Sequence, residues 1–163
     1  MEREQAVKFM QDLLKLMIEK KGSDLFITVD FPPAMKIQGK MTPVSKTALT
    51  PENCKAMVYA VMNDRQLKEY EATKECNFAV APRGIGRFRA NAFIQQGFCG
   101  LVMRVIETEA PNIDKLGLPE VLKETVMVKN GLIIMVGGTG SGKSTSLAAM
   151  IDYRNRNSYG HII

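Results

Sequence analysis

The stretch from Gly131 to Thr145, GLIIMVGGTGSGKST, constrains the fold more than any other part of this 163-residue chain. An apolar run, Leu132 to Val136, leads into a glycine-rich turn, and a segment of helix-forming residues follows. Every fixed position of the phosphate-loop pattern G-x-x-x-x-G-K-[ST] is filled. The sequence therefore predicts a strand, a phosphate-binding turn and a helix, in that order.

The residue types of this loop suit a nucleoside triphosphate, so ATP and Mg²⁺ are the expected ligands. Backbone N–H groups can wrap a polyphosphate only where no Cβ blocks the approach, and the positive end of the following helix favours the same anion. We expect Lys143 to reach the β and γ phosphates and the Ser144 hydroxyl to bind Mg²⁺. The predicted nucleotide site comprises Gly137, Gly138, Thr139, Gly140, Ser141, Gly142, Lys143, Ser144 and Thr145.

Composition and cysteine content exclude several classes of protein. No apolar run is long enough to cross a bilayer, and the charged N-terminus, Met1 to Glu4, does not resemble a signal peptide. Three widely spaced cysteines and the single His161 argue against a zinc site and against a disulfide framework. We therefore expect a cytoplasmic protein with reduced thiols.

The charge pattern does not favour nucleic-acid binding. The net charge is +5, but the basic residues are spread along the chain, which favours a solvated surface. The segment RGIGRFR, Arg83 to Arg89, shares a basic residue and two glycines with an RNA-binding strand signature. Ile85 and Arg87, however, stand where that signature has base-stacking aromatics. We expect no nucleic-acid partner.

The first 106 residues predict an α+β domain with a mostly antiparallel sheet, PAS-like in outline. Apolar residues recur at helical spacing over residues 2–21, and Thr50 with Pro51 forms a cap and first turn for a second helix. A third helix is expected to begin at Asp64. Alternating apolar and polar residues predict strands at residues 23–29, 34–38, 41–44, 76–81, 86–95 and 99–106.

The remaining residues predict a linker and the beginning of a second domain. Residues 107–118 contain Pro111 and Gly117 and resemble a connector. Residues 119–163 are expected to hold a helix at 120–126, the strand 132–136, a helix at about 142–154 and the start of another strand at 161–163. Since a phosphate-loop strand belongs to a parallel sheet with neighbours on both sides, we expect this chain to be part of a longer protein.

Three arginines lie in the last two expected strands of the first domain. Arg87 and Arg89 share one face of their strand, for which an exposed polar face is the favoured interpretation. Arg104 lies on the same side of its strand as Val102 and Ile106. It is either paired with a carboxylate or directed at an anion.

Sequence blocks spread over almost the entire chain resemble one family. They are GSDLFIT at 22–28, PPAMKIQGK at 32–40, GRFRANAF at 86–93, LVMRVIE at 101–107 and GGTGSGKSTSLAAMIDYRN at 137–155. These blocks are similar to those of the secretion and pilus ATPases, in their PilT/PilU branch. ECNFA at 75–79 and RGIGRFR at 83–89 are more similar to the PilU side of that branch.

The resemblance implies a cytoplasmic hexameric ATPase, peripheral to the inner membrane at the base of the type IV pilus machine, that drives pilus retraction and twitching motility. It implies a PAS-like N-terminal domain, a RecA-like domain that begins with residues 119–163, and nucleotide bound between the two. Arg87, Arg89 and Arg104 match arginines that approach the phosphates in this family. The implied partners are further copies of the chain, a related retraction ATPase and an inner-membrane pilus platform protein.

The family's acidic box with the catalytic glutamate, its second metal-binding motif and its histidine box match no residue here. We therefore expect the chain alone to bind nucleotide weakly at best and not to hydrolyse it.

Two other functions fit parts of the sequence. A small-molecule kinase would share the phosphate loop, but it would need an acceptor pocket and a lid after that loop, whereas here a long α+β region precedes it. A truncated docking module of the pilus machine would ignore nucleotide altogether. The size of the protein in solution with and without Mg-ATP would separate these alternatives.

Overall fold

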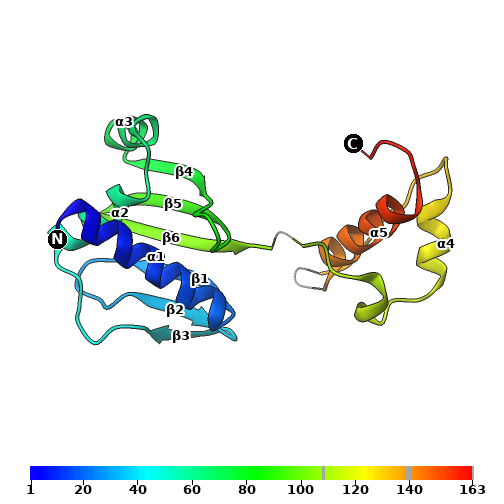
Figure 1. Cartoon of the computed structure of the whole chain (residues 1–163), viewed down its shortest axis with the longest axis horizontal. Helices are drawn as coiled ribbons and strands as arrows, with labels where there is room; N and C mark the ends of the chain where they lie inside the picture. Colours follow the sequence, from blue (N-terminus) through cyan, green and yellow to red (C-terminus); the bar gives the residue numbers. More distant parts are fainter. Residues whose placement is uncertain (108, 139–140, 163) are drawn as a thin grey trace. The chain divides into compact units, whose positions relative to one another are not determined.

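The structure, a computed structural model, describes residues 1–107, 109–138 and 141–162 (Figure 1). The chain forms two compact units, Met1–Glu107 (unit 1) and Thr108–Ile163 (unit 2). Among the described residues, no helix has both the length and the apolar character needed to cross a membrane.

Unit 1 is an α+β unit built on one antiparallel sheet, as the sequence predicts. Every strand pair is antiparallel, and the six strands follow the spatial order β3-β2-β1-β6-β5-β4. Its elements are α1 (Arg3–Glu19), β1 (Gly22–Ile27), β2 (Ala34–Ile37), β3 (Lys40–Pro43), α2 (Pro51–Ala60), α3 (Asp64–Thr73), β4 (Glu75–Val80), β5 (Arg87–Gln95) and β6 (Phe98–Ile106).

The core of unit 1 lies between the sheet and the helices α1 and α2, which contact β1 and β6 (Figure 1). Leu25 and Ile27 of β1 lie opposite Met103 and Leu101 of β6, and all four side chains are buried. Each such buried side chain contributes about 1.5–3 kcal/mol to folding. Alternate residues of the same strands point to the opposite face of the sheet, which carries the polar and charged side chains of the candidate site.

Side-chain caps begin α2 and α3 of unit 1, and the cap of α2 at Thr50 is the one that the sequence predicts. Thr50 Oγ1 accepts a hydrogen bond from the backbone N–H of Asn53 at 3.3 Å, and Pro51 occupies the first turn of α2. Asn63 and Gln66 form a reciprocal capping box at the start of α3, with both bonds at 2.9 Å. Such caps contribute about 1 kcal/mol each.

Unit 2 contains η1 (Ile113–Leu116), α4 (Val121–Met127) and α5 (Lys143–Asn157) around a small apolar core. The buried apolar side chains of this core are Ile113, Val126, Ala149 and Met150. Ile113 belongs to residues 107–118, the segment that the sequence predicts to be a linker. Arg154 of α5 donates to the backbone carbonyl oxygens of Val126 and Val128 and so joins α5 to the C-terminal end of α4.

The strand predicted at residues 132–136 is not formed, and neither is the one predicted to begin at His161. Unit 2 has no strand among its described residues, so the backbone of the apolar run has no ladder to join. Its side chains are correspondingly exposed, with 83% of Leu132 and 89% of Val136 accessible. The pattern is typical of a buried strand, but this prediction is wrong for the chain as it folds here, because a strand also requires a neighbour.

Candidate functional site

The phosphate loop leads from this apolar run into α5, and one of its glycines has a conformational reason to be glycine. Gly142, just before α5, has a φ of 88°, in the left-handed region that favours glycine. At Gly137 a β-carbon would lie 2.7 Å from Ser141 Oγ, so the serine side chain would have to rotate away. Thr139 and Gly140, also predicted to bind nucleotide, lie outside the described residues.

The N-terminus of α5 is open to an anion. Within the described residues no side chain caps this 15-residue helix, and the predicted ligands Ser144 and Thr145 are exposed. The first N–H groups of an α-helix lack intrahelical partners, and the aligned peptide dipoles place partial positive charge there. A phosphate group at this position would gain both the hydrogen bonds and the charge interaction.

Lys143 is folded back over the loop. Its Nζ donates to the carbonyl oxygens of Gly137 at 2.8 Å and Gly138 at 2.6 Å. An ammonium group has three donors and no acceptor, so these two bonds leave one donor, and a phosphate oxygen could also replace either carbonyl. The loop conformation thus already holds the cation beside the helix N-terminus.

These donors fit a triphosphate with Mg²⁺. The described residues contain no cluster of three or more His, Cys, Asp or Glu side chains that could hold a metal ion by itself. Mg²⁺ commonly binds through one or two protein oxygens together with phosphate oxygens and water. The exposed Ser144 hydroxyl could supply such an oxygen, while Lys143 and the loop N–H groups would hold the phosphates.

The three candidate arginines of unit 1 all lie on the sheet face opposite the helices, and all are exposed. The register of the antiparallel strands places Arg89 of β5 directly opposite Arg104 of β6. Both line a hollow of about 300 Å³ whose other lining residues are Asp24, Asn77, Asn91 and Val102. Arg87 lies opposite Ile106 and does not line the hollow. The structure therefore brings together two of the three predicted arginines.

The carboxylate partner of Arg104 is Asp24. Arg104 Nε donates to Asp24 Oδ1 at 2.8 Å, and Ser23 Oγ donates to Asp24 Oδ2, also at 2.8 Å. Burial raises the pKa of Asp24, but these hydrogen bonds and the charge of Arg104 outweigh burial and hold the pKa below its usual value. Of the two interpretations that the sequence leaves open for Arg104, pairing with a carboxylate is confirmed.

Sequence reasoning missed Asp24 as a site residue. The local signal is weak: Asp24 is a charged residue near the start of β1, between Ser23 and Leu25, at a position that alternation places on the sheet face away from the core. Its partner is 80 residues further along the chain, and only the pairing of β1 with β6 brings the two together.

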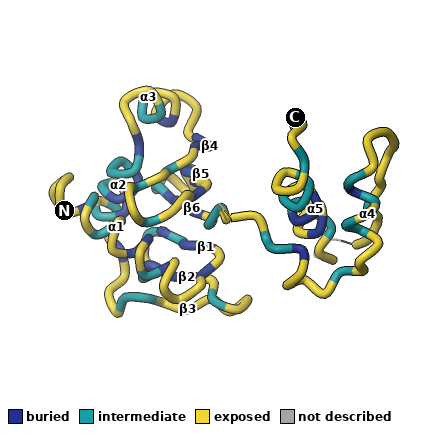
Figure 2. The backbone as a smooth tube through the Cα atoms, turned by 45° about the vertical axis from the view of Figure 1, so that its right-hand side comes forward, coloured by how far each residue is buried: buried dark blue, intermediate teal, exposed yellow. Residues whose placement is uncertain are grey.

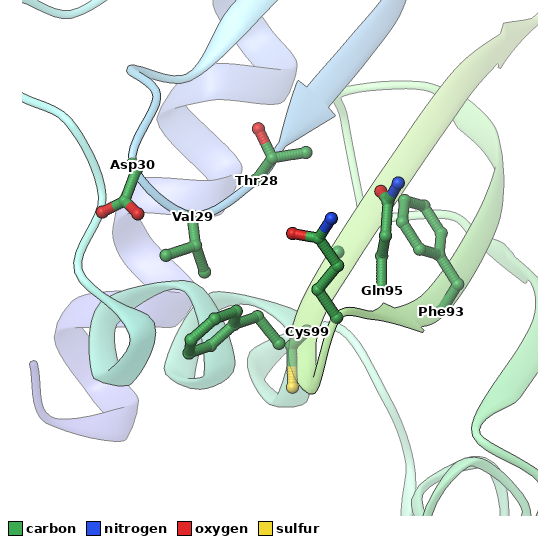
Figure 3. Close-up of a pocket in the computed structure, with 9 residues that line it drawn as sticks. Thr28, Val29, Asp30, Phe93, Gln95 and Cys99 are labelled. Atoms are coloured by element: carbon green, nitrogen blue, oxygen red, sulfur yellow. The ribbon is translucent and has the colours of Figure 1, made fainter.

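A second hollow of unit 1, of about 160 Å³, has different chemistry (Figure 3). It lies where β1 ends, beside the turn between β5 and β6, and Asp30 is its only charged lining residue. Cys99 also lines it, and the Cys99 carbonyl accepts a hydrogen bond from the buried thiol of Cys54 at 2.9 Å. Since a lone carboxylate repels phosphate, this hollow does not suit the phosphates of a nucleotide.

Two relatives of the chain are named as pilus ATPases. The type IV pilus ATPase PilU of Pseudomonas aeruginosa is 56% identical over 153 residues, which make up 94% of this chain and 40% of PilU. The type IV pilus retraction ATPase PilT of the same organism is 38% identical over 93% of this chain and 44% of its own length. This chain therefore spans less than half the length of these two relatives.

A solved structure and a family profile agree with these matches. The crystal structure of the pilus retraction motor PilT with bound ADP superimposes with a TM-score of 0.80 at 40% identity, over 89% of this chain and 43% of that one. The profile described as type II/IV secretion system protein matches residues 2–163. The chain therefore belongs to the type II/IV secretion system protein family, in the branch that contains PilT and PilU.

Proposed function

We propose that this chain is the N-terminal part of an ATP-hydrolysing motor that powers type IV pilus retraction and hence twitching motility. The observation that carries the proposal is the phosphate loop, with Lys143 held over its carbonyl oxygens beside the uncapped start of α5. The names of PilU and PilT support the choice of pilus retraction among the many activities of phosphate-loop proteins.

Each residue of the loop has a proposed role. Lys143 exchanges a loop carbonyl for β- and γ-phosphate oxygens, the N–H groups of the loop and of α5 bind the remaining phosphate oxygens, and Ser144 orients the metal. The bound Mg-ATP supplies the phosphoanhydride bond that water attacks. The protein contributes mainly by holding groups in place and by stabilising negative charge.

The domain organisation and the assembly are part of this proposal. Residues 1–106 are a PAS-like domain, residues 107–118 a linker whose Ile113 packs in the core of unit 2, and residues 119–163 the start of a RecA-like domain. The complete protein would work as a cytoplasmic hexamer peripheral to the inner membrane, with a related retraction ATPase and a pilus platform protein as partners. Within such a motor, hydrolysis would change the angle between the two domains.

The proposal is tested first on nucleotide binding, with Lys143→Ala and a matched control, Lys129→Ala. Lys129 is an exposed lysine of unit 2 outside the loop. Binding is measured as the anisotropy of a fluorescent ATP analogue, with and without Mg²⁺. Lys143→Ala should bind the analogue about tenfold or more weakly, which corresponds to a loss of about 1.4 kcal/mol or more. Lys129→Ala should bind as the unaltered chain does. Equal binding by both variants contradicts the proposal.

The cellular test separates the motor from a nucleotide-independent docking module. In the organism that encodes the chain, Lys143→Ala introduced into the gene should abolish twitching as fully as deletion does. If deletion abolishes twitching while Lys143→Ala leaves it intact, the docking module is the correct function. A kinase would leave twitching unaffected in both strains.

A further inference from the structure

We propose that Asp24 is a positioning residue: it holds Arg104 by Nε, so that the two terminal nitrogens of Arg104 are oriented, beside Arg89, toward the phosphate that the resemblance to the family already assigns to these arginines. This inference rests on the proposed function, because it assigns a phosphate of the nucleotide, or a free phosphate of the same chemistry, to the hollow of unit 1.

The register of β1, β6 and β5 brings the three side chains of this site together. Asp24 of β1 lies opposite Arg104 of β6, and Arg104 lies opposite Arg89 of β5. The three side chains therefore form one row across three neighbouring strands, on the same face of the sheet. The rigidity of this row comes from the backbone ladder, since β6 is hydrogen-bonded to a strand on each side.

The two partners of the salt bridge differ in exposure, which suits Asp24 to the role of holding Arg104 in place. The Asp24 side chain is 7% exposed, whereas that of Arg104 is 71% exposed. Asp24 bonds Nε, and in the part of the chain that the structure describes this is the only ion pair of Arg104. A guanidinium has five N–H donors. The four on the terminal nitrogens thus remain available in the geometry that grips a phosphate through two parallel hydrogen bonds.

The charge balance of the hollow points to an anion. Arg89 has no ion pair within the described residues, so one carboxylate faces two guanidinium groups. Like charges directly opposite each other on neighbouring strands destabilise a sheet. Asp24 offsets one of the two charges, and a bound phosphate would offset the other. Glu75, which accepts a hydrogen bond from Asn91 at 3.1 Å, does not line the hollow.

The ion pair also explains why an acidic residue belongs in a phosphate site. If Asp24 acted only through its charge, it would repel the phosphate, and removing it would tighten binding. If it acts by fixing Arg104, removing it frees the guanidinium to rotate and weakens binding. The two effects have opposite signs, so variants of Asp24 can separate them.

The test is a titration of the chain with inorganic pyrophosphate, followed through the Nε–H resonances of Arg89 and Arg104 in NMR spectra. All variants carry Lys143→Ala, which removes the main ligand of the phosphate loop. Asp24→Asn keeps an acceptor for Nε without the charge, and Asp24→Ala removes both. We expect binding about fivefold weaker in Asp24→Ala, and binding within about twofold of the reference in Asp24→Asn, which corresponds to less than ~0.5 kcal/mol.

A second variant keeps the test decisive if Asp24→Ala does not fold. Arg104→Lys preserves the positive charge and a partner for Asp24 but loses the fork of donors, and it should bind pyrophosphate about fivefold more weakly. Tighter or unchanged binding in every variant, or no shift of either arginine resonance in the reference chain, overturns the proposal. Because every chain in this titration lacks the Lys143 ammonium, pyrophosphate binding is measured at the arginines of unit 1. A failure of this proposal is therefore distinct from a failure of ATP binding at the phosphate loop.

Discussion

Units 1 and 2 contain apolar segments of similar character that have different fates. In unit 1, β1 lies between β2 and β6, and its Leu25 and Ile27 are completely buried. In unit 2, residues 132–136 form no strand and are largely exposed (Figure 2). The comparison teaches that an apolar run predicts a segment that needs a neighbouring strand to bury it. Whether the segment folds as a strand depends on whether that neighbouring strand is present. The comparison also predicts that most of the stability of this chain belongs to unit 1.

The largest expected effect is that of truncating the core of unit 1. Phe88 of β5 is fully buried and packs in the main core, so Phe88→Ala should destabilise unit 1 by about 3–5 kcal/mol through lost burial and the cavity left behind. Amide hydrogen exchange measured by mass spectrometry would report this as lost protection in the peptides of β1, β5 and β6.

Met150→Ala is the matched variant in unit 2, where Met150 is buried in the small core. It should lower protection in α5 and leave the strands of unit 1 unchanged. If each variant lowers protection in both units equally, the two units unfold as one body, and the contrast between them does not hold.

The second prediction compares thiols placed in the two regions. Burial, and then the neighbouring Cys99, raises the pKa of Cys54 to about 12, and the side chain is inaccessible. A cysteine introduced by Val136→Cys would replace a residue that is 89% exposed. At pH 8 the introduced thiol should react with iodoacetamide at least about 100-fold faster than Cys54, because the thiolate is the reactive form and must be accessible.

Labelling in urea provides the control, since both thiols should then react at similar rates. Equal protection of the two thiols in the native chain would mean that residues 132–136 are paired after all.

Features that depend on a few neighbouring residues could be predicted from the sequence, whereas contacts between residues far apart in the chain could not. The cap at Thr50, the helix start at Asp64, the alternation of the strands and the phosphate loop are each contained within a few residues, and the sequence identifies them. The pairing of β1 with β6 joins residues about 80 positions apart, so neither Asp24 nor its bond to Arg104 could be derived from local spacing. The strand at residues 132–136 was predicted wrongly for the same reason, because its neighbours cannot be inferred from its own residues.

The smallest predicted effect concerns Tyr70, which attaches α3 to the sheet of unit 1. Its hydroxyl donates to the backbone carbonyl of Phe93 at 2.9 Å, and the ring is buried. Tyr70→Phe keeps the ring and removes this bond, so it should cost about 1 kcal/mol at neutral pH. Urea unfolding followed by circular dichroism would measure the difference.

The same variant should change how the stability of unit 1 depends on pH. Burial first, and then the interaction with Cys99, raises the pKa of Tyr70 well above its ordinary value. The folded state therefore keeps the phenol proton at a pH where the unfolded state, with a pKa near 10, releases it. The stabilisation is complete below about pH 10 and is lost as the pH rises above that value.

Since phenylalanine has no such proton, Tyr70→Phe should lose less stability between about pH 10 and 11 than the unaltered chain, and parallel profiles would contradict this assignment. Cys54, Tyr59 and Cys76, whose pKa values are also raised, titrate in both proteins, so the difference between the two profiles reports Tyr70 together with its interactions with Cys54 and Tyr59.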